Sequence, residues 1–163
     1  LICGDYILGN LGESEEDVRS GFDKFIKLKN LFSAYIPIFI PCPGTALWKN
    51  AYDSSKLARL TDGNIDWSKF DPSSGLALDL GYGDLSGLRD ELEVRFYTSK
   101  RFVDDMLEVL KTRPSFLKIF IKRFGYIVER FGNKESIDEA IRLKASEIFS
   151  RLLSVSVDKT ISE

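Results

Sequence analysis

The sequence contains no histidine, and only two cysteines. Histidine is the commonest general base and the commonest ligand of transition metals, so sites that depend on it are excluded. Cys3 and Cys42 are too few for a disulfide framework and have no further cysteine or histidine with which to complete a zinc site. We therefore expect both cysteines to be small apolar side chains of the core.

Long apolar runs and an excess of positive charge are also missing. No apolar run reaches the roughly 18 residues that a membrane-spanning helix needs. The 23 Lys and Arg residues against 25 Asp and Glu leave a net charge of −2, with a pI of about 5.4. A nucleic-acid-binding domain usually carries a basic patch, so we expect no nucleic-acid partner and no transmembrane segment. With neither an initial methionine nor a signal peptide, we expect a piece of a longer, cytoplasmic protein.

The composition that remains is that of a globular protein. The 163 residues are 44% hydrophobic, 29% charged and 12% aromatic. This length suits one domain or a large part of one. We expect an α/β fold with strands and helices over residues 1–60, a connecting loop over 61–83 and a helical region over 84–163.

Residues 1–60 have the pattern of a β-α-β unit. Apolar runs over 1–8 and 34–40 predict two strands that are buried on both faces, as in a parallel sheet or barrel. Helices are predicted over 15–29 and 46–57. Ser14 is a good N-cap, with Asp17 completing a variant of the capping box, whereas Pro37 should cost the second strand a hydrogen bond. Such a unit cannot cover both faces of its own strands, so we expect it to require partner strands that are missing from this sequence.

The region after residue 84 follows helical spacing throughout. Pro114 is expected to open a helix that ends at Gly132, and a last helix is expected over 135–155. The apolar stretch 116–131 could lie on a membrane surface, but we favour packing against its own protein. Two earlier apolar stripes follow helical spacing: Leu85, Leu88, Leu92 and Phe96, and then Phe102, Val103, Met106, Leu107 and Leu110.

A glycine-rich turn follows the first predicted strand and opens a helix. Parallel α/β sheets and barrels bind ligands at this end of their strands. Glycine permits positive φ and a close approach of the backbone to a ligand, and free amides at a helix start accept anionic groups. The alternative is a tight turn with an exposed Glu13 that caps the helix. The candidate binding residues are Gly9, Asn10, Gly12 and Glu13.

A second turn, rich in proline, follows the next predicted strand and would border the same pocket. Prolines stiffen the loop, and Thr45 could cap the helix that follows. A rigid strand-to-helix turn is the simpler interpretation of each residue taken singly. The candidate residues here are Pro41, Pro43, Gly44 and Thr45.

Two segments resemble radical S-adenosylmethionine (SAM) enzymes. YILGNLGESEEDVRSGFDKFIKL, residues 6–28, is similar to their F-I-x-G-L-P-G-E-T-x-E-x-x-x-x-T segment, and IFIPCPGTALWKNA, residues 38–51, is similar to P-Y-P-G-T-x-L-Y-x-x-A. DWSKFD and the pair Phe96-Tyr97 resemble the tail of the cobalamin-binding subgroup that includes anaerobic magnesium-protoporphyrin monomethyl ester cyclases and hopanoid-modifying enzymes.

The resemblance implies the last β/α units of a TIM-type barrel followed by helices, with the missing N-terminal part of the same barrel as their partner. The parent enzyme would cleave SAM reductively at a [4Fe-4S] cluster, to abstract hydrogen or to transfer methyl groups through cobalamin. The four glycine-turn candidates would then lie beside SAM, and the four from the second turn would form the neighbouring rim. The substrate would be a small molecule, of a lipid or tetrapyrrole-like kind in this subgroup. The C-x-x-x-C-x-x-C loop that holds the cluster is absent from this sequence, so we expect the segment alone to be inactive.

Two other interpretations stay open. One is a β/α enzyme that binds phosphate at the glycine-rich turn, although neither G-x-G-x-x-G nor G-K-[ST] follows the strand. The other is a non-catalytic helical interaction module with a β-α-β cap.

Overall fold

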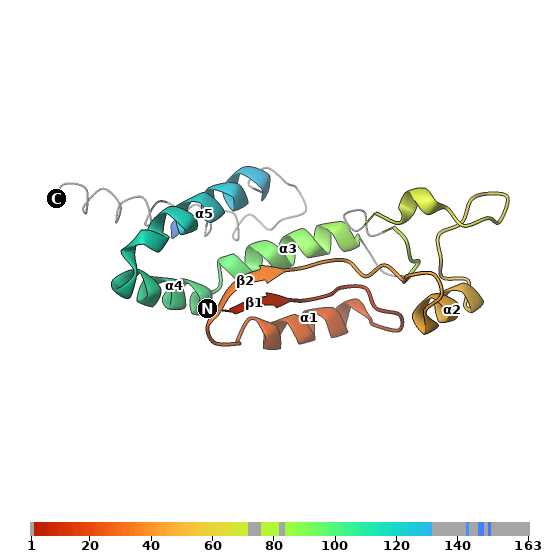
Figure 1. The fold of residues 1–163 in the computed structure, drawn as a ribbon, viewed down its shortest axis with the longest axis horizontal. Helices are drawn as coiled ribbons and strands as arrows, with labels where there is room; N and C mark the ends of the chain where they lie inside the picture. The colour runs from red at the N-terminus through yellow and green to blue at the C-terminus, as the bar shows by residue number, and fades with distance from the viewer. Residues whose placement is uncertain are drawn as a thin grey trace. The chain divides into compact units, whose positions relative to one another are not determined.

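The computed structural model describes residues 2–71, 76–81 and 84–131, together with residues 143, 147, 148 and 150. The fold is mixed α/β and mostly helical, with a small two-stranded sheet (Figure 1). The elements in chain order are β1 (Ile2–Asp5), α1 (Glu15–Phe25), β2 (Leu31–Tyr35), α2 (Ala46–Asp53), the 3-10 helix η1 (Trp67–Lys69), α3 (Leu85–Tyr97), α4 (Lys100–Thr112), the 3-10 helix η2 (Pro114–Phe116) and α5 (Leu117–Phe131).

Two compact units are formed from stretches that lie far apart in the sequence. Unit 1 comprises Leu1–Cys3, Ile26–Ser33 and Asp90–Glu163, and unit 2 comprises Gly4–Phe25 and Ala34–Arg89. The expected end of the third helix at Gly132 lies outside the described residues. Of the last expected helix, over 135–155, only residues 143, 147, 148 and 150 are described, and all four are helical. The domain boundaries at residues 60 and 84 stay a prediction.

The strands pair in parallel, as predicted. In unit 2 the amide of Leu8 donates to the carbonyl of Pro37 at 2.9 Å, and the amide of Phe39 donates to the carbonyl of Leu8 at 2.7 Å. The second strand begins earlier than expected, at Leu31, and its regular part ends at Tyr35. Pro37 explains the early end, because it has no N–H to give to a ladder.

The expectation of strands buried on both faces is wrong. Every residue of β1 is exposed except the half-buried Gly4, and Tyr35 at the end of β2 is 64% exposed. The sheet holds two strands in the described part of the chain, so each has a neighbouring strand on one side only. A strand is buried on both faces only where helices or a second sheet cover both of them, and the described residues do not cover both faces of β1.

The first helix begins where its capping residues predicted. The Ser14 hydroxyl accepts from the amide of Asp17 at 3.1 Å, and the Asp17 carboxylate accepts from the amide of Ser14 at 3.0 Å. This reciprocal pair is the expected variant of the capping box. Val18 and Phe22 are fully buried on the inner face. The helix ends at Phe25 rather than near residue 29, because the chain turns there and reaches Asn30 with φ of 60°.

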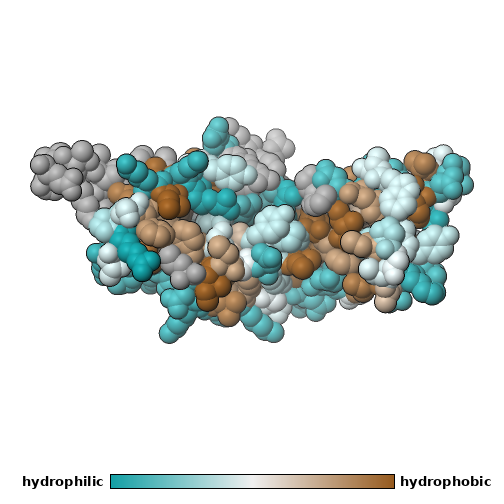
Figure 2. Space-filling view, viewed as in Figure 1, coloured by the Kyte–Doolittle hydropathy of each residue, from teal (hydrophilic) through white to brown (hydrophobic). Residues whose placement is uncertain are grey.

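The helix α2 belongs to a second apolar cluster of unit 2. It is shorter than the predicted 46–57, since Ser54 caps its C-terminus and Ser55 has φ of 55°. Trp48 on α2 stacks on Trp67 with centroids 5.4 Å apart and planes at 7°. Figure 2 shows apolar side chains at the surface over this part of unit 2. The cluster centres on buried Ala51, Leu57 and Leu78, with Leu11, Phe39, Trp48, Ile65, Phe70 and Leu80 packed against it.

Helices α4 and α5 and the end of α3 build the core of unit 1. The α3 stripe is buried, and so are Phe102, Met106 and Leu110 of the α4 stripe. Leu107 is 42% exposed, because it lies one position past Met106, on the outer side of the helix.

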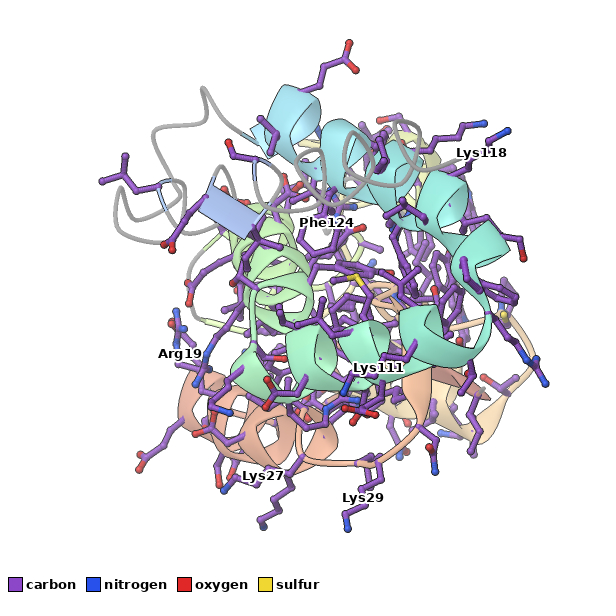
Figure 3. All side chains as sticks on the ribbon, turned by 90° about the vertical axis from the view of Figure 1, so that its left-hand side faces the viewer. Arg19, Lys27, Lys29, Lys111, Lys118 and Phe124 are labelled. Atoms are coloured by element: carbon purple, nitrogen blue, oxygen red, sulfur yellow. The ribbon has the colours of Figure 1, made fainter. Side chains whose placement is uncertain are left out.

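The apolar helix α5 packs within unit 1. Its residues Phe120, Phe124 and Ile127 are buried, which supports packing over the membrane-surface alternative. Figure 3 shows Phe124 pointing into the space beside α4 while Lys118 points away. Over the residues that the structure describes, no helix is both long enough and apolar enough to cross a membrane.

Candidate functional site

The glycine-rich turn after β1 is held in shape by its own glutamate. The Glu13 carboxylate accepts hydrogen bonds from the amides of Gly9 and Asn10, each at 3.1 Å, and the Glu13 amide donates to the Asn10 carbonyl at 3.1 Å. Glu13 therefore caps the turn and not the following helix. The two amides that could have received an anion already have a carboxylate partner.

The two glycines of this turn serve different purposes. Both have positive φ, 79° at Gly9 and 82° at Gly12, which favours glycine at each position. A Cβ on Gly9 would lie 3.2 Å from the Leu85 side chain and 3.3 Å from the Leu80 side chain, so both leucines would have to shift by a few tenths of an ångström. A Cβ on Gly12 would meet nothing within 4 Å. Gly12 therefore presents bare backbone to open space, where another molecule can approach.

The second turn has a similar plan. Gly44 has φ of 85° and open space where a side chain would stand. Thr45 is the N-cap of α2, as predicted: its hydroxyl accepts from the Trp48 amide at 3.1 Å and donates to the Cys42 carbonyl at 2.7 Å. Pro41 is buried and Pro43 is exposed. These contacts stiffen the turn and leave Gly44 accessible.

Strand pairing brings the two turns to one end of the sheet. Leu8, which precedes the first turn, pairs with Ile38, and the Phe39 amide bonds to the Leu8 carbonyl. Leu11 of the first turn packs against the same cluster as Trp48, which follows the second. All eight candidate residues belong to unit 2. The adjacency expected from the sequence is therefore consistent with the strand register.

Neither cysteine lies in the core. Cys3 and Cys42 are both exposed, so the expectation that they are core side chains is wrong. Each lies at a place the sequence did not mark as surface, Cys3 on the open strand β1 and Cys42 on the proline turn. Among the described residues, no group of three or more Cys, Asp or Glu side chains is arranged to hold a metal ion.

One titratable group behind the first turn is perturbed. Burial raises the pKa of the Tyr6 hydroxyl above its ordinary value, and the nearby charges of Glu13 and Asp23 raise it further. The hydroxyl donates to the Val18 carbonyl at 2.6 Å. Tyr6 therefore stays neutral and fixes α1 to the strand at neutral pH.

Unit 1 contains a groove that the sequence did not predict. It has a volume of about 420 Å³. The only hint in the sequence was a pair of carboxylates, Asp105 and Glu108, beside the apolar stripe of the α4 segment. Its lining residues are Asn30, Leu31, Phe32, Phe102, Asp105, Met106, Glu108, Val109, Thr112 and Phe120.

A polar network that the sequence did not predict also lies in unit 1. The Arg123 guanidinium donates to Glu93 at 3.0 Å and to the Tyr97 hydroxyl at 2.8 Å, and it lies 4.6 Å from the Tyr97 ring centroid. The Tyr97 hydroxyl is also 3.2 Å from the Ser33 hydroxyl. These contacts join β2, α3 and α5, so we assign this network to stability.

Comparisons of the chain with models of protein families, with curated proteins and with solved structures find no match.

Proposed function

We propose that this chain is the C-terminal part of a radical SAM enzyme, and that the two turns of unit 2 form part of the SAM-binding rim. The observation that carries the proposal is the parallel pairing of Leu8 with Ile38, because the two glycine-containing turns begin just after these paired residues. Ligands of parallel α/β folds bind at that end. The barrel itself, cobalamin and the substrate class belong to the same proposal.

The exposed strands support a larger sheet. Ile7 is 49% exposed and Tyr35 is 64% exposed, although both belong to the paired strand segments of unit 2. Apolar side chains in this position are normally covered by neighbouring strands and helices. A barrel with further strands would cover them, and a protein partner is the alternative occupant.

Gly12 and Gly44 suit contact with SAM better than the other candidates. Each offers backbone without a side chain and with open space around it. Glu13 acts as a positioning residue, because its carboxylate holds the amides of Gly9 and Asn10. Pro41, Pro43 and Thr45 keep the second turn rigid. The radical chemistry is supplied by the bound cofactors, and these residues orient them.

The described residues do not fit an iron-sulfur cluster. Such clusters are held by cysteine thiolates, usually four, and this chain has two exposed ones far apart in the sequence. In our proposal the cysteines that hold the cluster come from another part of the parent protein, and the residues of this chain contribute only to the binding of SAM.

The decisive experiment begins with the coding sequence upstream of Leu1, read in frame. We expect a C-x-x-x-C-x-x-C loop within further β/α units. SAM affinity of the reconstituted parent protein is then measured by equilibrium dialysis. We expect Gly12→Val and Gly44→Val to weaken binding by on the order of tenfold or more, because a side chain would occupy the approach to the backbone.

Gly63→Val is the matched control. Gly63 also has positive φ, 87°, and open space, but it lies in the 57–78 loop of unit 2. Val at this position should cost similar backbone strain and leave SAM affinity unchanged. A coding sequence without the cysteine loop would overturn the proposal and favour the helical interaction module. Unchanged affinity in folded Gly12→Val and Gly44→Val proteins would make both turns purely structural.

A further inference from the structure

We propose that the groove of unit 1 binds an amphiphilic organic cation, in which an ammonium group is attached to an aromatic or aliphatic body. The groove is distinct from the two turns of unit 2, and all its lining residues belong to unit 1. Its volume of about 420 Å³ lies in the range of about 300–1,000 Å³ that is typical of small-molecule sites.

The floor of the groove is apolar and closely packed. Phe102, Met106 and Phe120 are each 2% exposed, and Leu31 is 4% exposed. Phe32 packs against Phe120 with ring centroids 5.3 Å apart. Aromatic rings and a methionine sulfur make favourable contacts with a flat or chain-like apolar body. The floor therefore recognises the apolar part of a ligand.

Two carboxylates belong to the lining of the groove, and each forms an ion pair with a residue of α4 that lies outside the lining. Asp105 and Glu108 line the groove one helical turn apart on α4, and no Lys or Arg is among the lining residues. In each carboxylate, one of the two oxygens already has a hydrogen-bond or ion-pair partner. Asp105 Oδ2 accepts from the Asn30 amide at 3.2 Å and from Arg101 at 2.9 Å, and Glu108 Oε1 pairs with Lys111.

The second oxygen of each carboxylate, Asp105 Oδ1 and Glu108 Oε2, accepts no hydrogen bond from the described part of the chain. An ammonium group can donate to both carboxylates at once, and charge-assisted hydrogen bonds of this kind are among the stronger ones. An anionic ligand would face two carboxylates, and a neutral one would leave them without a new partner. The two carboxylate oxygens that accept no hydrogen bond therefore favour a cation that donates to them.

The single methionine of the chain makes the groove directly observable. Met106 is the only methionine of the sequence, so [methyl-¹³C]methionine labelling of a chain freed of its initiating methionine by a cleavable tag gives one protein methyl signal, and that signal comes from the groove floor. The probe is 2-(1-naphthyl)ethylamine at neutral pH, with 2-(1-naphthyl)ethanol as the uncharged analogue. We expect the amine to shift the signal saturably and the alcohol to bind at least about tenfold more weakly.

Three variants of the full chain separate charge recognition from other effects. Glu108→Gln and Asp105→Asn should each weaken amine binding several-fold. Asp104→Asn is the matched control: Asp104 is on the same helix and pairs with Lys100, but it does not line the groove. Its affinity for the amine should equal that of the unaltered chain.

The Glu108 side chain is 70% exposed, so Glu108→Gln should fold normally even if Asp105→Asn does not. Far-UV circular dichroism confirms folding of each variant. Equal binding of amine and alcohol would overturn the cation assignment, and so would equal weakening by Asp104→Asn. A methyl signal that does not move with either compound would overturn the site itself.

Discussion

The hydroxyl of Tyr6 occupies the space that a side chain at Gly21 would need. The hydroxyl donates to the Val18 carbonyl at 2.6 Å, and a Cβ built on Gly21 would lie 2.5 Å from the same oxygen. The ring also packs edge-on against Phe22, with centroids 5.3 Å apart. One aromatic residue of the strand thus fixes both the position of α1 and a glycine in the middle of that helix.

Gly21→Ala should therefore destabilise unit 2, although alanine is ordinarily better than glycine inside a helix by about 1 kcal/mol. The methyl group forces the Tyr6 hydroxyl off its acceptor. In a Tyr6→Phe background the same substitution should become neutral or stabilising, because the nearest remaining ring atom lies at an ordinary contact distance, 3.5 Å. Urea denaturation of the four proteins measures this coupling, and additive effects would contradict it.

The capping box of α1 predicts a loss of stability in acid. Hydrogen bonds from the side chain and amide of Ser14 lower the pKa of Asp17 below its ordinary value. The group is therefore more acidic in the folded chain, so its contribution is present above the unfolded pKa of about 4 and is lost as the pH falls through the folded value. Asp17→Asn should flatten the pH dependence of the melting temperature near pH 4.

Glu16→Gln provides the comparison for Asp17→Asn, because Glu16 lies in the same first turn and is exposed. Removing the charge of Glu16 should leave the fall of the melting temperature in acid unchanged. Identical curves for Asp17→Asn and the unaltered chain would show that the capping box does not control this titration.

Arg123 should not tolerate replacement by lysine. Its guanidinium bonds to Glu93 and Tyr97 and lies over the Tyr97 ring, whereas a lysine ammonium cannot make all of these contacts. We expect Arg123→Lys to reduce the free energy of unfolding by about 2 kcal/mol. Lys122→Arg, one residue away on an exposed position, should change it little. Equal effects of the two substitutions in urea denaturation would refute a specific role for the network.

Local signals made the helices predictable. Ser14 and Asp17 are three residues apart, and Thr45 directly precedes α2, so each capping contact depends on neighbours in the sequence. The apolar stripe of α3 follows the helical period in the same way. Parallel pairing of the two strands also followed from the helix that connects them.

Burial and the groove depend on distant residues and could not be predicted in the same way. The exposure of β1 is set by which elements cover its two faces, and the sequence of one strand does not reveal this. The Glu13 carboxylate accepts a hydrogen bond from the Gly9 amide and does not cap α1. The amides at the start of α1 are as close to Glu13 in the sequence as Gly9 is, so the sequence did not decide between them. The groove joins Asn30 and Phe32 to residues of α4 and α5 that lie seventy or more positions later.

The stack of Trp48 on Trp67 has an optical consequence. These are the chain's two tryptophans, and both belong to unit 2. Their indole rings are nearly parallel with centroids 5.4 Å apart, so their electronic transitions couple and give a near-ultraviolet circular dichroism signal. Tryptophan fluorescence therefore follows unit 2 alone, whereas the backbone signal follows both units. Coincident transitions of the two signals would mean that the units unfold together, and separate transitions would give each unit its own stability.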